Sequence, residues 1–167
     1  MDKKFGFGVI GTGNIAKFHA HCIDKIPNAK LLGVLSKTES RARQVAKDFN
    51  APVFWEIEKL LSQSEIDIVC VCNESGLHGP TISKIAKAGK NVLCEKPLET
   101  SVKKIDEIAD WVKSSGIQLG CVFQNRENPE YKKLKNYLIS GSLGKILLCQ
   151  TSINWYRPPS YYKDSWR

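Results

Sequence analysis

The sequence predicts an α/β fold, a doubly wound parallel sheet with helices on both faces. Three observations support this class. Short apolar runs alternate with stretches of helical periodicity through the first 125 residues, which is the pattern of repeated β–α–β units. The run 66–72 is almost continuously apolar, as expected of a strand buried on both sides. A glycine-containing turn joins the first apolar run to the first helical stretch.

The alternating segments predict six strands and the helices between them. The strands are expected at 5–10, 30–35, 53–54, 66–72, 91–94 and 118–123. Helices are expected at 14–26, 39–49, 78–88 and 101–114, with a helical turn at 57–62. The first helix is predicted from apolar residues at every third or fourth position, namely Ile15, Phe18, Cys22 and Ile26.

Residues 126–167 are expected to begin a second, smaller α+β domain. A helix is predicted over 128–140 with Asn128 as its N-cap. Lys145 to Tyr156 is predicted to be a long strand, because it mixes β-forming apolar residues with polar ones. We therefore divide the chain into a domain over 1–125 and the incomplete start of a second one.

Charge and hydropathy exclude several classes of function. The chain has 25 Lys and Arg residues against 17 Asp and Glu residues, a formal net charge of +8. A basic balance raises the question of nucleic acid, but the cations are spread along the chain at helical spacing. No apolar run reaches the roughly 18 residues of a membrane span, and the first residues do not resemble a signal peptide. We expect a cytoplasmic protein that binds neither nucleic acid nor a membrane.

The six cysteines predict reduced thiols and no metal site. None of them shows a C-x-x-C spacing, which makes a zinc or redox motif unexpected. Several lie inside apolar strands, where cysteine behaves as a small hydrophobic residue. The cysteines are Cys22, Cys70, Cys72, Cys94, Cys121 and Cys149.

The turn after the first strand has the pattern G-x-G-x-x-A. It reads Gly11-Thr12-Gly13-Asn14-Ile15-Ala16 and opens the first helix. Gly11 permits a tight turn, Gly13 allows a pyrophosphate to approach the backbone, and Ala16 lets the helix pack closely on the sheet. The free N–H groups of the helix N-terminus suit phosphate oxygens. This context predicts a Rossmann dinucleotide-binding site, the alternative being a glycine turn without a ligand.

The end of the second strand bears on which dinucleotide binds. A carboxylate at this position would accept a hydrogen bond from the ribose 2′-hydroxyl of NAD. The sequence has Ser36 there, with Lys37 and Arg41 close by. A hydroxyl and two cations favour the 2′-phosphate of NADP, while Glu39 keeps NAD open and surface charge remains the simpler alternative for the two cations.

The fifth predicted strand ends in Glu95-Lys96-Pro97. Ligands of open parallel sheets bind at the carboxyl ends of the strands, so a lysine here can lie beside a nicotinamide ring. Such a lysine can exchange a proton with a substrate hydroxyl. The alternative is an exposed lysine in a turn.

These motifs carry a family resemblance. The glycine loop, residues 71–78, residues 88–92 and the sequence 95–98 fall in the order and spacing of the glucose–fructose oxidoreductase, inositol dehydrogenase and rhizopine-catabolism family (Gfo/Idh/MocA). The similarity extends over essentially the whole chain. It implies hydride exchange between NAD(P) and a ring hydroxyl of a sugar, cyclitol or nucleotide sugar.

The motifs and the resemblance together name the expected site residues. Lys96 is the expected catalytic acid/base, and His19 and His21 are expected to be structural or on the surface. The dinucleotide is expected to contact Gly11, Thr12, Gly13, Asn14, Ile15, Ser36, Lys37, Arg41, Asn73, Ser75, Leu77, His78, Glu95, Lys96 and Gln124.

The tail resembles that of members that act on UDP-N-acetylated sugars as 3-dehydrogenases. The residues expected to bind substrate are Arg126, Trp155, Tyr156 and Arg157. Aromatic rings stack on sugar or uracil, and arginine pairs with phosphate or carboxylate. The alternative is that these aromatic residues cover a domain interface.

Two functions follow from the sequence. The resemblance implies that full members complete their active site with a later helix that carries an Asp and a His, and we expect residues 1–167 to lack that segment. The first function is an NAD(P)-dependent oxidoreductase of which this chain is the cofactor-binding part, with an oligomer as a further expectation. The second is a dinucleotide-binding module without turnover, so whether this chain is an enzyme by itself is left open.

Overall fold

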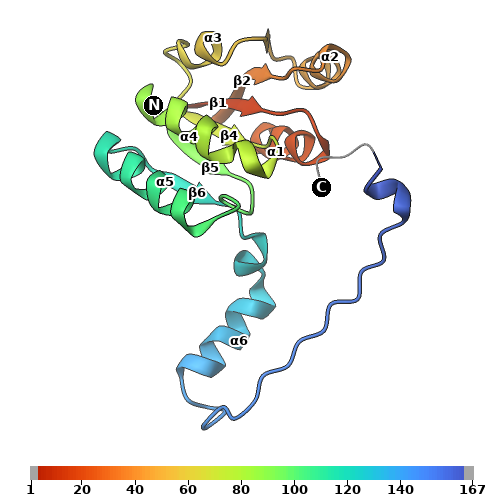
Figure 1. Ribbon diagram of the computed structural model, residues 1–167, viewed down its shortest axis with the longest axis vertical. Coiled ribbons are helices and arrows are strands. Elements are labelled where there is room, and N and C mark those ends of the chain that lie inside the picture. Colours follow the sequence, from red (N-terminus) through yellow and green to blue (C-terminus); the bar gives the residue numbers. More distant parts are fainter. Residues whose placement is uncertain (1–3, 164–167) are drawn as a thin grey trace. The chain divides into compact units, whose positions relative to one another are not determined.

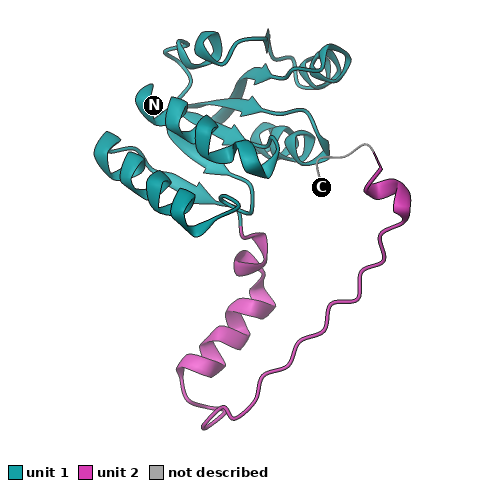
Figure 2. Ribbon diagram, viewed as in Figure 1, with its two compact units in different colours: residues 1–122 teal, residues 123–167 magenta. Residues whose placement is uncertain are grey.

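The computed structural model describes residues 4–163. The chain divides into two compact units, residues 1–122 and residues 123–167 (Figure 2). No described helix is long and apolar enough to cross a bilayer.

The first unit is built on a six-stranded parallel sheet (Figure 1). Its strands are β1 (Phe5–Ile10), β2 (Ala29–Leu35), β3 (Val53–Phe54), β4 (Ile68–Val71), β5 (Asn91–Cys94) and β6 (Leu119–Cys121). Their spatial order is β3-β2-β1-β4-β5-β6, and every neighbouring pair is parallel. The predicted fold class is therefore confirmed.

Helices cover both faces of this sheet. They are α1 (Asn14–Asp24), α2 (Glu39–Asp48), α3 (Ile57–Leu61), α4 (His78–Lys87) and α5 (Val102–Ser115). One core cluster joins α1 and α2 to the sheet, and the other joins α3, α4 and α5 to it. Successive side chains of β1 point to opposite faces of the sheet, so Val9 packs in the first cluster and Ile10 in the second.

Helix α1 packs on the sheet through a different face from the one that predicted it. Ile15, Phe18 and Ile26 are 41%, 61% and 44% exposed. The buried residues of the helix are Ala16, His19, Ala20 and Ile23. The glycine turn requires a close helix–sheet approach, and the alanine face permits this approach where the larger apolar side chains would not.

The second unit contains a short 3-10 turn, η2 (Gln124–Glu127), helix α6 (Pro129–Ile139) and a second turn, η3 (Pro159–Tyr161). The predicted cap is confirmed, since the Asn128 side chain accepts a hydrogen bond from the backbone N–H of Glu130 at 2.8 Å.

The strand predicted over Lys145–Tyr156 is wrong. These residues form no strand, and each of them is exposed. A strand needs a neighbour for its backbone N–H and C=O groups, and this segment pairs with no strand of the described chain. Its β-forming composition alone is insufficient to make a strand.

Candidate functional site

The carboxyl ends of β1, β4 and β5 bring the sequence motifs to one edge of the sheet. The chain runs from β1 outward to β2 and β3 on one side, and from β4 to β5 and β6 on the other. The strand order therefore reverses between β1 and β4, which is where open α/β sheets bind ligands. Gly11 follows β1 there, Asn73 follows β4, and Glu95 follows β5.

Gly11 shapes the turn after β1. Its φ of +110° lies in a region that L side chains rarely adopt. Its backbone N–H donates to the Leu35 carbonyl oxygen at 2.8 Å, which ties the turn to the end of β2. A Cβ at Gly11 would lie 2.6 Å from the carbonyl oxygen of Cys72. Only glycine fits this position without displacing the backbone after β4.

Gly13 leaves open space at the start of α1. Its φ of −72° is ordinary, and a Cβ at this position would meet nothing within 4 Å. No side chain caps α1, so its first N–H groups have no side-chain acceptor. Open space beside free N–H groups and the positive end of a helix dipole fits the pyrophosphate of a dinucleotide.

A hydroxyl pair holds the end of β2. The Thr12 and Ser36 hydroxyl oxygens are 2.7 Å apart, and Ser36 Oγ also accepts from the Thr38 backbone N–H at 3.1 Å. Thr12 is buried, so the glycine turn at residues 11–13 is tied to the end of β2.

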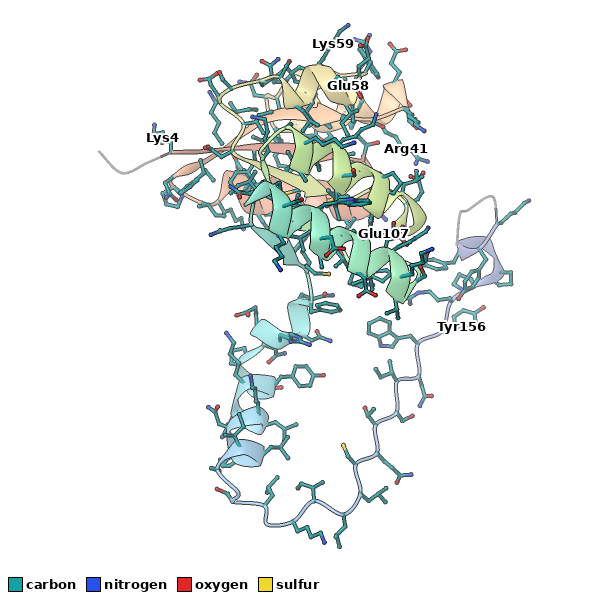
Figure 3. All side chains as sticks on the ribbon, turned by 60° about the vertical axis from the view of Figure 1, so that its left-hand side comes forward. Lys4, Arg41, Glu58, Lys59, Glu107 and Tyr156 are labelled. Carbon is teal, nitrogen blue, oxygen red and sulfur yellow. The ribbon has the colours of Figure 1, made fainter. Side chains whose placement is uncertain are left out.

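The charged residues near this end are arranged on helix α2 and just before it. The nearest carboxylate, Glu39, is paired with Arg43 at 2.6 Å. Lys37 and Arg41 are exposed, and the Arg41 side chain lies on the outer surface of the unit (Figure 3). Along the chain from Ser36 to Arg41, the structure therefore has two exposed cations and one carboxylate, which is paired with Arg43.

Asn73 carries an unusual polar atom after β4. Its Nδ2 donates to the Thr81 hydroxyl at 3.0 Å. Its Oδ1 is buried and has no hydrogen-bond partner among the described residues. An orphaned buried acceptor is costly unless a ligand supplies a donor, so Asn73 also fits a bound polar group. Ser75 beside it is buried, and Leu77 is exposed.

His78 ties the β4 loop to the β5 loop. The side chain is only 1% exposed, and its Nδ1 lies 2.8 Å from the carbonyl oxygen of Pro97. Its Nε2 lies 3.2 Å from the carbonyl oxygen of Asn73. Both ring nitrogens thus face carbonyl oxygens of the protein. A direct contact between this ring and a dinucleotide stays a prediction, which the burial does not favour.

Glu95 and Lys96 differ sharply in environment. Glu95 is 7% exposed, and its Oε1 lies 2.9 Å from His19 Nε2. Lys96 is exposed and followed by a cis peptide bond to Pro97. The glutamate thus anchors the end of β5 while the lysine ammonium faces outward at the same edge.

Glu99 secures the segment after Pro97. Burial opposes ionisation of this carboxyl, but the backbone N–H and hydroxyl of Thr100 and the Lys104 ammonium together hold its pKa below the usual range. The loop that carries Lys96 is therefore fixed at both ends.

The second unit brings two of the predicted substrate residues together. The Arg157 guanidinium carbon lies 5.2 Å from the ring centre of Trp155 and 5.2 Å from that of Tyr161. Tyr156 is 81% exposed and projects from the extended segment (Figure 3). Arg126 lies over the Phe123 ring at 5.4 Å. Gln124 is exposed in η2.

The matching family model describes an oxidoreductase family with an NAD-binding Rossmann fold, and it covers residues 5–123. This range includes the glycine turn, Asn73 and the Glu95-Lys96-Pro97 sequence. The chain belongs to the Gfo/Idh/MocA oxidoreductase family.

The similar proteins include an inositol dehydrogenase and a dehydrogenase bound to a nucleotide sugar. A myo-inositol 2-dehydrogenase of Thermotoga maritima is 30% identical over 139 residues, which are 83% of this chain and 42% of the relative. The crystal structure of the WlbA dehydrogenase from Bordetella pertussis in complex with NADH and UDP-GlcNAcA has a TM-score of 0.95 at 28% identity. The match covers 100% of this chain and 49% of that one.

A third member of the family has a shorter match. The structure of scyllo-inositol dehydrogenase from Lactobacillus casei with NAD(H) and scyllo-inositol has a TM-score of 0.80 at 26% identity, over 85% of this chain and 43% of that one. The chain spans about half the length of the curated relatives it matches.

Sequence reasoning expected His19 to be structural or on the surface, and it did not identify a partner for this residue. The structure shows His19 buried against Glu95, which lies 76 residues further along the chain. The available signal was its position on the small-residue face with Ala16 and Ala20. The prediction instead assigned the packed face of α1 to the larger apolar residues Ile15, Phe18 and Ile26, which are exposed.

The buried cysteines offer no nucleophile to the site. Burial raises the pKa of the Cys70 thiol to about 12, and it raises the pKa of Cys72 and Cys94 further. All six cysteines are free. No cluster of three histidine, cysteine or acidic residues in the described part of the chain has the geometry of a metal site.

A shallow hollow of about 210 Å³ lies at the other edge of the sheet. It is lined by the first half of β2, by the segment that leads into β3 together with Phe54, and by Gln63 and Glu65. None of the predicted site residues lines it. Its position at the amino ends of the strands argues against a ligand site in this fold.

Proposed function

We propose that the chain binds NADP(H), and NAD(H) more weakly, at the carboxyl ends of β1, β4 and β5. It would do so as the cofactor-binding part of an oxidoreductase that acts on a ring hydroxyl of a sugar or nucleotide sugar. The observation that carries the proposal is the open space at Gly13, beside the uncapped N-terminus of α1.

The preference for NADP(H) rests on the end of β2. Ser36 is fixed by Thr12 and by the Thr38 backbone, and it offers a hydroxyl instead of a carboxylate. Glu39 is occupied by Arg43, while Lys37 and Arg41 remain available to a 2′-phosphate. A phosphate dianion gains more from two cations and a hydroxyl than a ribose hydroxyl does.

Lys96 is the proposed acid/base residue. A bound nicotinamide supplies the hydride donor or acceptor, and Lys96 handles the proton of the substrate hydroxyl. Its ammonium is exposed at the carboxyl edge, where it is free to meet a substrate oxygen. The clamped backbone on either side of it limits the positions that this ammonium can reach.

The proposed substrate class is a sugar or UDP-sugar. The relative bound to UDP-GlcNAcA matches this chain through its whole length, including the second unit, whereas the inositol enzyme matches 85% of it. Arg157 between Trp155 and Tyr161 supports the same class, since it combines a cation for a phosphate or carboxylate with rings for stacking. Six free cysteines support a cytoplasmic location.

Calorimetric titration with NADPH and NADH tests the cofactor proposal. We expect saturable binding of both, with NADPH tighter. Ser36→Asp should reverse the preference by about tenfold or more, because a carboxylate repels the 2′-phosphate and accepts from the ribose hydroxyl. Gln44→Asp, which adds the same charge further along α2, is the matched control and should leave the preference unchanged.

Two outcomes separate the alternatives. Hydride transfer from NADPH or NADH to a panel of oxidised UDP-sugars would support the oxidoreductase. Tight binding without turnover of any of them would support the second function, a dinucleotide-binding module. Failure to bind either dinucleotide would contradict both.

A further inference from the structure

A buried hydrogen bond joins helix α1 to the loop that carries Lys96. His19 lies on α1, the helix that begins at the glycine turn, and Glu95 is the last residue before Lys96. The two side chains are 9% and 10% exposed, and His19 Nε2 lies 2.9 Å from Glu95 Oε1. Because a carboxylate only accepts hydrogen bonds, Nε2 carries the proton of this contact.

Glu95 uses its second oxygen on its neighbour. Its Oε2 accepts from the backbone N–H of Lys96 at 3.3 Å. Its own backbone N–H donates to the Val71 carbonyl oxygen at 3.0 Å, which continues the pairing between β5 and β4. One carboxylate thus fixes the backbone direction at Lys96 and takes its own orientation from His19.

The contact costs more to build than an apolar pair would. A carboxylate removed from water is unfavourable unless its oxygens are hydrogen-bonded, and a well-packed apolar pair at the same place would stabilise the fold at least as well. The pair also spans 76 residues and links two motifs of the proposed site. A purely structural role therefore explains its presence less well than a role in the site does.

We propose that His19 is a positioning residue that acts through Glu95 to hold Lys96 for the nicotinamide half of the dinucleotide. The inference rests on the proposed function, because it needs a dinucleotide bound at this edge. His78 holds the same loop through the carbonyl oxygen of Pro97. His19 therefore holds the loop against α1, and His78 holds it against the start of α4.

The test compares NADH with ADP-ribose, which lacks the nicotinamide. The variant is His19→Phe, which keeps a ring of similar size and removes the donor. NADH should bind about tenfold more weakly, because the loop that carries Lys96 is no longer held in the position that the nicotinamide half requires. The affinity of the variant for ADP-ribose should stay within about twofold of that of the unchanged protein, because this ligand has no nicotinamide to meet the Lys96 loop. His19→Gln, which restores a donor, should recover most of the NADH affinity.

The controls distinguish positioning from general damage. His21→Phe makes the same change on an exposed position of α1 and should alter neither affinity. If His19→Phe proves unfolded in its thermal melt, the comparison is made with His19→Leu and His19→Gln. An equal loss for both ligands, or no loss for NADH, would overturn the proposal. If the unchanged protein binds neither ligand, the proposed function fails and this inference fails with it.

Discussion

At the scale of single residues, Gly11 and Gly13 meet different requirements of the same turn. Gly11→Ala places a Cβ against the Cys72 carbonyl at a φ of +110°. We expect the variant to lose about 2 kcal/mol or more of unfolding free energy, from backbone strain and overpacking. Urea denaturation followed by circular dichroism measures this loss.

Gly13→Ala is the matched variant two positions later. Its Cβ meets nothing within 4 Å and its φ is ordinary, so the unfolding free energy should stay within about 0.5 kcal/mol. Its dinucleotide affinity should nevertheless fall by about tenfold or more, because the methyl group occupies the space of the pyrophosphate. Unchanged affinity in this variant would contradict the assignment of the open space to phosphate.

The raised pKa of the Cys70 thiol predicts that the unfolding free energy falls in alkali. Burial raises its pKa in the folded protein to about 12 from 9.0. Above pH 9 the unfolded chain releases this proton while the folded chain keeps it, so the stabilisation is complete below pH 9 and is lost as the pH rises toward 12. The slope is at most about 1.4 kcal/mol per pH unit for this thiol.

Denaturation of Cys70→Ala in reducing buffer checks this. The variant should lose less unfolding free energy than the original between neutral pH and about pH 10. Cys149→Ala, at an exposed position of the second unit, is the matched control and should retain the original slope. Equal slopes for all three proteins would show that Cys70 ionises as readily in the folded state as in the unfolded one.

The sequence was informative about residues whose role depends on the local backbone. The glycine spacing predicted a tight turn between β1 and α1, and the positive φ of Gly11 confirms that turn, while its contact with phosphate stays a prediction. His19 could not be found in this way, since its partner lies 76 residues away and only the tertiary fold brings them together. The buried Oδ1 of Asn73 could not be predicted either, because only the tertiary fold determines that it lacks a hydrogen-bond partner.

At the scale of elements, helix α1 shows what periodicity can and cannot predict. The spacing of apolar residues correctly predicted a helix, whose observed end at Asp24 is two residues earlier. It did not identify the packed face, because α1 has two apolar stripes and only the one with small residues fits close to the sheet. The exposed stripe contains Phe18, which is 61% exposed, whereas Ile23 on the other stripe is 3% exposed.

Two substitutions on α1 test this assignment. Phe18→Ser should change the unfolding free energy by no more than about 0.5 kcal/mol, as at other exposed sites. Ile23→Ala should cost about 2–5 kcal/mol, because it removes buried methyl groups and leaves a cavity. Chemical denaturation of both variants measures the two effects. The reverse order would mean that the stripe with Phe18 is the packed one.

The segment 145–156 marks a second limit at this scale. Its composition favours a strand, yet strand formation depends on a partner edge, and the segment has none in the described chain. Element predictions succeeded throughout the first unit, where each strand has neighbours. The strand prediction failed at 145–156, where no described strand lies beside the segment to pair with it.

At the scale of the whole molecule, three motifs that are distant in sequence meet at one edge of the sheet. The strand order places the turn at Gly11–Gly13 next to Asn73, and the pairing of β4 with β5 brings in Glu95 and Lys96. The alternation of strands and helices was enough to predict this arrangement.

The most direct test of this account is the mapping of backbone amide shifts by NMR during titration with NADPH. We predict that the largest changes fall at Gly11–Ile15, Asn73–Leu77 and Glu95–Lys96, with further changes at Ser36 and Lys37. The amides around the hollow near Gln63 and Glu65 should be unaffected. Changes centred on that hollow, or no saturable changes at the carboxyl edge, would contradict the claim that this edge is a dinucleotide site.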